Sequence, residues 1–272
     1  MIGKRPYVIG VDVGGSKILI QIFDKKMNLL TEEQAKTQTR KGEKGFQTQL
    51  TELIRKHFSK TVKTIGIALP GIVHREKGLL VHAPHLPTKK DFPVRKLMEK
   101  EFGVPVVVDN DINAFLIAEH ERPALKKYRN IVAVMIGTGV GGAIMNDGRL
   151  LYGANGYAGE AGHIITNKDS KYDTLEKNAG GAYLPKISKD EKKIKAHLLE
   201  HMAVGLSNLN QLFNPEIIVL GGSVYHHYLS TEKKKLEGFI ASRSLAKTSP
   251  KIMDAGKRTS VAYGAALLAK QK

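Results

Sequence analysis

The sequence predicts an α/β protein of two lobes, in which one unit of strand, glycine turn and strand occurs twice. A chain of 272 residues with 42% hydrophobic content can bury two cores of ordinary size. Short β-branched runs alternate with segments of helical periodicity. A shift of 125 residues lays IGVDVGG (9 to 15) over VMIGTGV (134 to 140), so that Asp12 meets Gly137 and Gly14 meets Gly139.

The first part of the chain is expected to contain several strands and one long helix. Apolar runs with β-branched residues indicate the strands, and apolar residues at helical spacing indicate the helix. The expected elements are a hairpin of YVIGVDVGG (7 to 15) and KILIQIF (17 to 23), a third strand after the turn 24 to 28, a helix over 44 to 58, and buried strands at TIGIAL (64 to 69) and VPVVVD (104 to 109).

The second part begins with a helix and then returns to strands. Asp111 starts a helical pattern that stops before Pro123, and as an acid at that point it could cap a helix over 112 to 121. Residues 131 to 136 form an apolar run before the glycines. The Asn146-Asp147-Gly148 step then predicts a hairpin turn between two further strands.

The segment GTGVGG (137 to 142) fits the G-x-G-x-x-G template of a dinucleotide-binding turn. It lies between two predicted strands, whereas the dinucleotide fold requires a helix after the turn. An NAD-dependent oxidoreductase is therefore disfavoured. Two glycine hairpins on two similar lobes could instead clasp a nucleotide.

Composition excludes some functions and leaves others open. The 43 Lys and Arg exceed the 26 Asp and Glu and give a net charge of +17, which favours anionic ligands. The lysine-rich segments are mixed with acids and contain no recognisable nucleic-acid-binding module, so solvated helix faces are expected and no nucleic-acid partner. The absence of cysteine excludes disulfides, thiolate metal sites and cysteine nucleophiles. We expect a cytoplasmic protein without a membrane partner, because no signal peptide or long apolar run is found.

A set of motifs, in order along the chain, is similar to the ROK family of sugar kinases. The resemblance implies two duplicated actin-like (ribonuclease H-like) lobes with a nucleotide and sugar cleft between them. It implies an N-terminal lobe over 1 to 110 joined by a C-terminal helix over 259 to 272, and a larger lobe over 111 to 258. The matching segments are DVGGSK (12 to 17), IALPG (67 to 71), VVVDNDINAFLIAE (106 to 119), IGTGVGGAI (136 to 144), GANGYAGEAGH (153 to 163), AVGLSNLNQLFNPEIIVLGGSV (203 to 224) and YGAALLA (263 to 269).

Two glycine turns carry the expected phosphate contacts. In DVGGSK, glycines let backbone N–H groups approach phosphate oxygens, while Ser16 and Lys17 add a hydroxyl and a cation. An acid at Asp12 is compatible with a polyphosphate only if Mg²⁺, through water, stands between them. The resemblance implies ATP and Mg²⁺ as cofactors, with Thr138 and Gly139 at the terminal phosphate. The expected nucleotide-site residues are Asp12, Gly14, Gly15, Ser16, Lys17, Thr138, Gly139, Gly221 and Gly222.

Asp111 is the expected general base. Phosphoryl transfer to a hydroxyl needs in-line positioning and an acceptor for the proton, and Asp111 matches the acid of the family's Asn-Asp pair. Asp109 is the less favoured base. A surface glutamate is the alternative interpretation of Glu176. The residues expected to bind sugar are Gly71, Asn110, Asp111, Glu160, His163 and Glu176.

The sequence departs from the family pattern after His163. Many relatives carry three zinc-binding cysteines there, whereas this chain has none, so no structural zinc is expected and the loop 164 to 175 must be held by other groups. His197 and His201 are four residues apart on a predicted helix, where ordinary exposed histidines are favoured over a zinc site. His85 stands where the family usually has an asparagine.

The resulting hypothesis is an ATP-dependent hexose kinase that phosphorylates the hydroxyl on carbon 6. Glucose is the default substrate, and fructose or an N-acetylated hexosamine remain alternatives. A non-catalytic sugar sensor of the same family is the rival. The DNA-binding branch is disfavoured because only about five residues precede the first strand. A homodimer is left open.

Overall fold

The chain folds into two compact units. The computed structural model describes residues 5–168, 171–246, 248–256 and 260–271. Unit 1 comprises the described residues within Met1–Glu121, Ala154–Tyr157 and Arg258–Lys272, and unit 2 those within Arg122–Gly153 and Ala158–Lys257. From the sequence we predicted a lobe boundary after residue 110. The compact units instead place the helix that follows residue 110 in unit 1.

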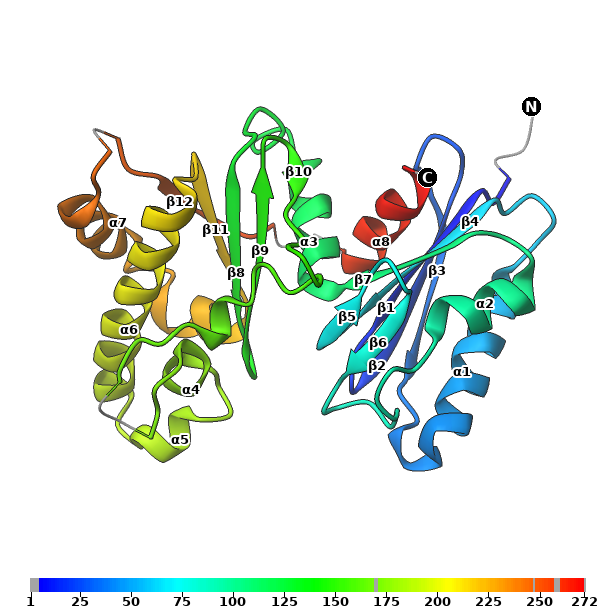
Figure 1. Ribbon diagram of the computed structural model, residues 1–272, viewed down its shortest axis with the longest axis horizontal. Helices are drawn as coiled ribbons and strands as arrows, with labels where there is room; N and C mark the ends of the chain where they lie inside the picture. The colour runs from blue at the N-terminus through cyan, green and yellow to red at the C-terminus, as the bar shows by residue number, and fades with distance from the viewer. Residues whose placement is uncertain (1–4, 169–170, 247, 257–259, 272) are drawn as a thin grey trace. The chain divides into compact units, whose positions relative to one another are not determined.

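Unit 1 contains a five-stranded sheet in the order β3-β2-β1-β4-β7 (Figure 1). β1, β2 and β3 pair antiparallel, whereas β1, β4 and β7 run parallel. The three expected strands of the opening meander are thus present. The strands are β1 (Val8–Val13), β2 (Lys17–Phe23), β3 (Leu29–Lys36), β4 (Thr64–Leu69) and β7 (Val106–Asn110).

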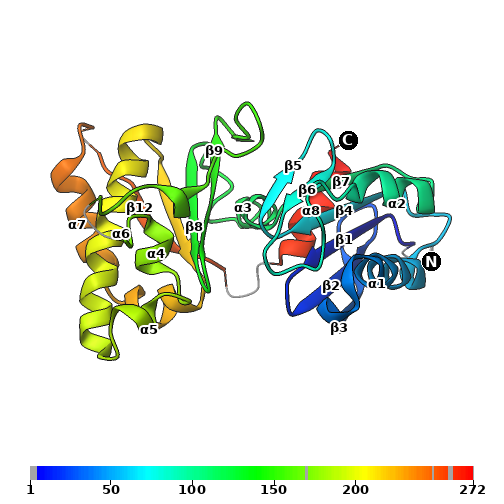
Figure 2. The same ribbon diagram turned by 60° about the horizontal axis from the view of Figure 1, so that its bottom comes forward.

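Two helices, α1 (Gly42–His57) and α2 (Val94–Phe102), cover one face of this sheet (Figures 1 and 2). Phe46, Leu50 and Ile54 of α1 recur every four residues and are fully buried in the core with the β-branched residues of β1, β2 and β4. Gly103 ends α2 in the left-handed conformation. A two-stranded hairpin of β5 (Ile72–His74) and β6 (Leu79–His82) follows β4.

The opposite face is covered by α3 (Asp111–His120) and α8 (Val261–Lys270), which pack on each other. α8 lies unusually close to the sheet because β1 and β4 present glycines to it. A Cβ atom on Gly66 would lie 1.9 Å from the carbonyl oxygen of Ala265, and one on Gly10 2.0 Å from that of Ala262. Residues 259 and 272 of the expected C-terminal helix lie outside the described residues.

Unit 2 repeats this arrangement with the sheet order β10-β9-β8-β11-β12. Again the first three strands pair antiparallel, and the strands equivalent to β1, β4 and β7 run parallel. The expected Asp147-Gly148 turn joins β9 to β10, and both residues have positive φ. The strands are β8 (Ile131–Ile136), β9 (Val140–Asn146), β10 (Arg149–Leu150), β11 (Ile217–Gly221) and β12 (Lys251–Asp254).

Helices of unit 2 bury a second apolar core against this sheet. The long α6 (Glu191–Phe213) starts at Asp190, whose carboxylate accepts from two backbone N–H groups, and ends at Asn214 in the left-handed conformation. Leu198, Met202 and Leu206 form its buried stripe. The other helical segments are η2 (Ala161–His163), α4 (Leu175–Ala179), α5 (Leu184–Ile187), the π-helical η3 (Tyr225–Leu229) and α7 (Lys233–Arg243); η1 (Thr39–Lys41) belongs to unit 1.

The duplication is therefore real, but the residue alignment drawn from the sequence was wrong by two positions. The turn after β1 spans residues 14 to 16, and the turn after β8 spans residues 137 to 139. Gly14 is thus equivalent to Gly137, and Asp12 to Met135. The sequence alignment was governed by shared glycines, whereas strand ends define the structural equivalence.

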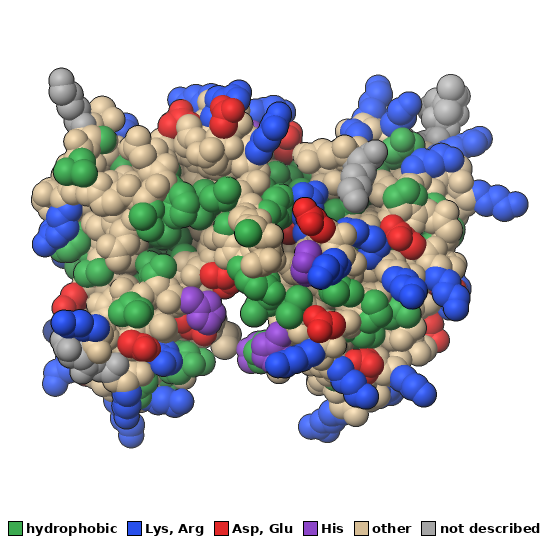
Figure 3. Space-filling view, in the orientation of Figure 1, with side chains coloured by type: hydrophobic (Ala, Val, Ile, Leu, Met, Phe, Trp, Pro, Cys, Tyr) green, Lys and Arg blue, Asp and Glu red, His purple; other side chains and the backbone are tan. Residues whose placement is uncertain are grey.

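Charged side chains are spread over both units. Lys and Arg side chains alternate with acidic ones on the visible surface of each unit in Figure 3. Ion pairs such as Lys56–Glu33 and Lys195–Glu232 link several of them. Within the described ranges, none of the helices combines the length and apolarity that a membrane crossing requires.

Candidate functional site

Most of the predicted site residues of unit 1 gather at one edge of its sheet. Parallel strands end at the same edge, so the segments that follow β1, β4 and β7 lie near each other there. These segments carry the turn 14 to 16, Gly71, and the pair Asn110 and Asp111. In α/β sheets this carboxyl edge is the usual place for a ligand site.

The turn after β1 is a tight hairpin held from the side by Thr37. The Gly14 N–H donates to the Lys17 carbonyl (2.8 Å), and the buried Thr37 donates its hydroxyl to the Gly14 carbonyl (2.7 Å). The Thr37 N–H in turn donates to the Ser16 carbonyl (3.0 Å). A Cβ atom on Gly15 would lie 2.9 Å from the Cβ atom of His85, so the exposed His85 packs its backbone against this turn.

Asp12 is a partly buried acid on the face of the sheet that α8 covers. Asp12 on β1 pairs with Ala68 on β4, and Ala68 pairs with Asp109 on β7. Burial raises the pKa of Asp12 to about 6, and the charge of Lys17 opposes that rise. No described residue donates a hydrogen bond to this carboxylate. Such an acid favours a nearby cation.

Asp109 is occupied by structural contacts. It is 3% exposed, and its Oδ1 accepts from the Asn110 N–H (2.8 Å) and from Asn113 Nδ2 (2.9 Å). Its Oδ2 forms an ion pair with Arg75 Nε at 3.1 Å. Because both oxygens are engaged, Asp109 is the poorer base, in agreement with the preference for Asp111.

The helix cap differs from the expectation. The alternative role considered for Asp111 was to cap a helix over 112 to 121, whereas the helix starts at Asp111 and Asn110 is its cap. Asn110 Oδ1 accepts from the N–H groups of Ile112 (2.8 Å) and Asn113 (3.4 Å). An asparagine in extended conformation caps as well as an aspartate. Asp111 Oδ1 also accepts from the Ile112 N–H (2.9 Å).

Asn110 also joins two of the segments at the sheet edge. Its Nδ2 donates to the carbonyl oxygen of Gly71 at 2.9 Å. Gly71 has a φ of 82°, and a Cβ there would lie 2.3 Å from the carbonyl oxygen of His82. Both residues therefore shape the site, and their contact with a sugar remains a prediction.

In unit 2 the equivalent turn after β8 is braced by a helix and a second glycine segment. The Gly181 N–H donates to the Gly137 carbonyl (2.8 Å), and the Ala182 N–H to that of Thr138 (3.0 Å). Glu176 of α4 accepts from the Val140 N–H at 3.0 Å. A Cβ atom on Gly139 would lie 2.4 Å from Glu176 Oε2. Thr138 is exposed at the tip.

The glycine pair after β11 lies at the same edge of the unit 2 sheet, because β8 and β11 are parallel. Gly222 has a φ of 95°, and a Cβ there would lie 2.2 Å from the Ile136 carbonyl oxygen. A Cβ atom on Gly221 would likewise contact the side chain of Met135. The turn 137 to 139 and the pair Gly221-Gly222, both predicted to bind nucleotide, therefore lie at one edge of the unit 2 sheet.

Three predicted sugar-binding side chains also come together in unit 2. His163 Nε2 lies 3.9 Å from Glu160 Oε2, and the side chains are 72% and 42% exposed, so both are accessible to a ligand. Burial raises the pKa of Glu160; the charge of His163 opposes the rise and that of Glu176 adds to it. Contact of these groups with a sugar remains a prediction.

A hydrogen-bond network holds the cysteine-free loop. Asn178 is 1% exposed, and its Nδ2 lies within hydrogen-bond distance of the carbonyl oxygens of Tyr172 (2.7 Å) and Thr174 (2.8 Å) and of Thr166 Oγ1 (3.3 Å). Thr174 caps α4 by accepting from the Lys177 N–H (3.3 Å). This network holds the segment that leads into α4, the helix that carries Glu176.

The expectation of ordinary exposed histidines was wrong for His201. It is 5% exposed, and its Nδ1 lies 3.2 Å from Thr166 Oγ1. Burial lowers its pKa, as does the adjacent His197, whose ring centroid is 4.3 Å away. Among the described residues, no group of three or more His, Cys, Asp or Glu is arranged to hold a metal. The histidine spacing thus reflects a packed helix face beneath the loop.

Several supporting residues were missed from the sequence. The Gly180-Gly181 pair, Thr37 and Asn178 each bind a predicted site loop through hydrogen bonds. The glycine pair in NAGGAY was a readable signal for a close backbone approach. The other two are single polar residues whose partners are far away in the sequence, and no local pattern marks them.

Comparison with known proteins gives a consistent assignment. The model of the ROK family matches residues 8–182. A glucokinase of Halalkalibacterium halodurans is 27% identical over 266 residues, covering 80% of this chain and 80% of the glucokinase. The crystal structure of a ROK hexokinase from Thermus thermophilus superposes with a TM-score of 0.84 at 25% identity, covering 97% of this chain and 98% of the hexokinase.

The similarity extends to a regulator as well as to kinases. A xylose repressor of Caldicellulosiruptor bescii is 27% identical over 260 residues, covering 79% of this chain and 65% of the repressor. The duplicated sheets agree with the actin-like fold of the hexokinase. Because the family model covers more than half of its residues, the chain belongs to the ROK family.

Proposed function

We propose that the chain is an ATP-dependent kinase that phosphorylates a hexose on the hydroxyl of carbon 6. The observation that carries this proposal is the carboxyl edge of the unit 1 sheet, where a partly buried acid, a glycine hairpin with a lysine, and a second acid at a helix start occur together. A sugar sensor would have no need of this combination. The relatives that are sugar kinases support the same activity.

The residues of the hairpin fit a nucleotide with Mg²⁺. The raised pKa of Asp12 and its lack of a hydrogen-bond donor among the described residues indicate an acid that a cation would stabilise. Asp12 would hold the ion through water, and the N–H groups of the turn with Lys17 would bind phosphate oxygens. Bound Mg²⁺ neutralises charge on the phosphates. On unit 2, Thr138 and Gly139 would contact the terminal phosphate, and Gly221 and Gly222 the adenosine.

In the proposed reaction Asp111 accepts the proton of the sugar hydroxyl. The hydroxyl oxygen forms a bond to the γ-phosphorus while the bond from that phosphorus to the β–γ bridging oxygen breaks, and ADP leaves. Asn110, Glu160, His163 and Glu176 would orient the sugar, and Gly71 would shape its site. Glucose is the first substrate to test, with fructose and N-acetylated hexosamines as alternatives.

The test is ADP release over a panel of hexoses. Asp111→Asn is expected to lower kcat by about 10²–10⁴-fold with little change in the sugar KM, because a base acts in the transition state. Glu52→Gln, which removes one exposed charge from α1, is the matched control and should turn over normally. Unfolding temperatures of both variants should stay close to wild type.

The outcomes separate the parts of the proposal. Equal rates for wild type and Asp111→Asn would show that Asp111 is not the base. Absence of turnover on every sugar, with sugar binding retained, would replace the kinase by a sugar-binding regulator of the kind suggested by the repressor relative.

A further inference from the structure

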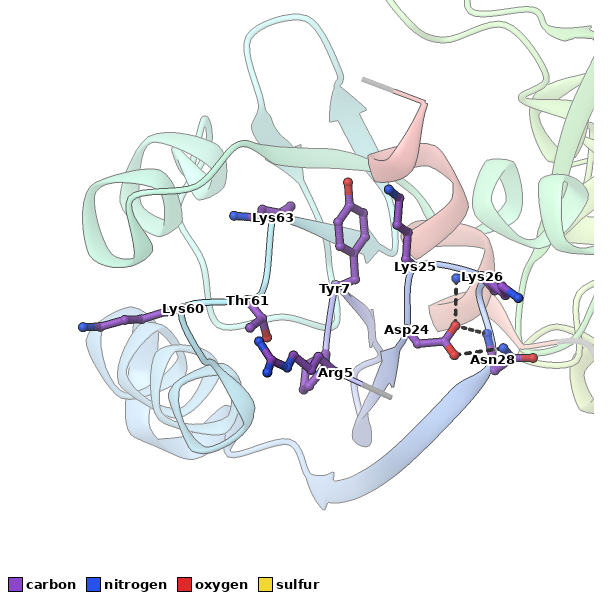
Figure 4. Close-up of a pocket in the computed structure, with 10 residues that line it drawn as sticks. Arg5, Tyr7, Asp24, Lys25, Lys26, Asn28, Lys60, Thr61 and Lys63 are labelled. Atoms are coloured by element: carbon purple, nitrogen blue, oxygen red, sulfur yellow. Dashed lines mark hydrogen bonds between the residues drawn. The ribbon is translucent and has the colours of Figure 1, made fainter. Parts of the chain in front are cut away.

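A second concave site lies in unit 1, at the sheet edge opposite the glycine hairpin. Tyr7 comes directly before β1 and Lys63 directly before β4, so this is the edge where the parallel strands begin. The cavity has a volume of about 740 Å³. We refer to it as the basic hollow, and it is lined by Arg5, Pro6, Tyr7, Asp24, Lys25, Lys26, Asn28, Lys60, Thr61 and Lys63 (Figure 4).

Three segments that are distant in the sequence bring five cations to this hollow. The backbone fixes their arrangement, because the Tyr7 N–H donates to the Phe23 carbonyl (2.8 Å) and the Lys63 N–H to the Tyr7 carbonyl (2.8 Å). Tyr7 therefore lies between the β2–β3 turn and the start of β4. In the view of Figure 4 its ring stands between Lys63 and Lys25.

Asp24 is the acid among the lining residues, and its oxygens accept hydrogen bonds within its own turn. Asp24 is 7% exposed, and its Oδ1 accepts from the N–H groups of Lys26 (2.8 Å) and Asn28 (2.9 Å). Its Oδ2 accepts from Asn28 Nδ2 at 2.9 Å. These bonds fix the turn that presents Lys25 and Lys26.

The five cations of the basic hollow have no ion-pair partner among the described residues. Lysines such as Lys56 and Lys177, in contrast, are paired with acids. Like charges gathered in a concave surface repel each other and concentrate a positive field there. An anion is the natural counterpart.

The size and lining define the class of anion. Ligand cavities in proteins span roughly 300–1,000 Å³, so the basic hollow is larger than a single phosphate requires. Lysine and arginine bind phosphate oxygens strongly, and Thr61 adds a hydroxyl. We propose that the basic hollow is a second ligand site, which binds a small molecule carrying two or more phosphate groups. It is separate from the proposed kinase site, because it lies at the other edge of the sheet.

The test uses inorganic tripolyphosphate in equilibrium dialysis, without sugar or Mg²⁺. The variant Lys25→Gln/Lys60→Gln/Lys63→Gln should lose more than about tenfold in affinity, because it removes three charge-assisted contacts. The matched control Lys189→Gln/Lys192→Gln/Lys193→Gln removes the same charge from exposed positions of unit 2 and should change affinity less than about twofold. Lys17→Gln, in the glycine hairpin, should leave this binding intact.

Residue-specific protection gives an independent measure. Tripolyphosphate should protect Lys25, Lys60 and Lys63 from acetylation, as read by mass spectrometry, and should leave Lys192 and Lys193 reactive. ADP, tested in the Lys17→Gln variant, distinguishes a nucleotide from an inorganic ligand: protection by both supports the shared phosphate chemistry, and protection by one identifies the source.

Three results would overturn the proposal. An equal loss in the unit 2 control would mean that overall charge, and not the hollow, binds the anion. Loss in Lys17→Gln with no protection of the three hollow lysines would place the anion at the glycine hairpin. Protection of the same lysines by single-stranded RNA but not by tripolyphosphate would identify a nucleic-acid surface instead.

Discussion

The two glycine turns, one in each unit, occupy the same place in the fold and differ in chemistry. Each follows the first strand of a five-stranded sheet with the same strand order. The turn of unit 1 has an acid two residues before it and a lysine just after it, and Thr37 holds it. The turn of unit 2 has Met135 in place of the acid and is braced by Glu176. The repeated sheet thus supplies the scaffold, and the residues that differ between the two turns supply the chemistry.

The strongest test of this difference is the substitution of equivalent positions. Asp12→Asn should lower kcat by about 10²–10³-fold and raise the Mg²⁺ concentration needed for activity. The asparagine lacks the negative charge that would attract the ion. Met135→Leu, at the equivalent position of unit 2, keeps the volume and should leave kcat within about twofold. The measurement is ADP release over a range of Mg²⁺ concentrations. Similar losses for both variants would contradict the asymmetry of the turns.

A smaller effect is expected on stability, and its sign depends on pH. Burial raises the pKa of Asp12 in the folded protein to about 6, above the ordinary value of 3.8, so proton uptake favours the folded state. This contribution is complete below about pH 3.8 and is lost as the pH rises through about 6. Above that pH the charged, desolvated carboxylate costs about 3 kcal/mol.

Asp12→Asn should remove this cost. In urea unfolding without Mg²⁺ or nucleotide, the variant should be more stable than wild type near pH 8, and the advantage should vanish near pH 4. An advantage that did not change with pH would show that Asp12 has an ordinary pKa in the folded chain.

The smallest expected effect concerns the brace of the second turn. Glu176→Ala leaves the Val140 N–H without its partner and opens space beside Gly139, so the nucleotide KM should rise about tenfold. Glu176→Gln keeps an acceptor oxygen and should retain a nearly normal nucleotide KM. If both variants instead raise the sugar KM alone, Glu176 acts as the sugar ligand that the sequence resemblance implies.

Local patterns predicted much of the fold but less of the site. The strands at residues 64 to 69 and 131 to 136 were predicted with correct bounds, because their apolar runs are uninterrupted. The fold class and the family followed from ordered motifs. The helix after β7 was one residue out, because asparagine and aspartate in succession are equally good caps and only the structure shows which side chain accepts the N–H groups.

The errors share a physical origin. Register between the duplicated halves depends on strand pairing, which glycine matching does not detect. His201 was predicted to be exposed because helical spacing shows that residues share a helix face but not what covers that face. Thr166, in the loop that follows His163, contacts His201. Thr37 and Asn178 support the site through tertiary hydrogen bonds, which no spacing rule describes.

The close approach of α8 to the sheet has a consequence for how the chain is made. Gly10 and Gly66 leave a groove in β1 and β4 that is filled by residues 261 to 270, which follow unit 2 in the sequence. During synthesis, the part of the unit 1 sheet that α8 covers therefore stays exposed until unit 2 has been translated. Unit 1 begins before unit 2 and is completed after it, so chaperone dependence should be concentrated in that interval.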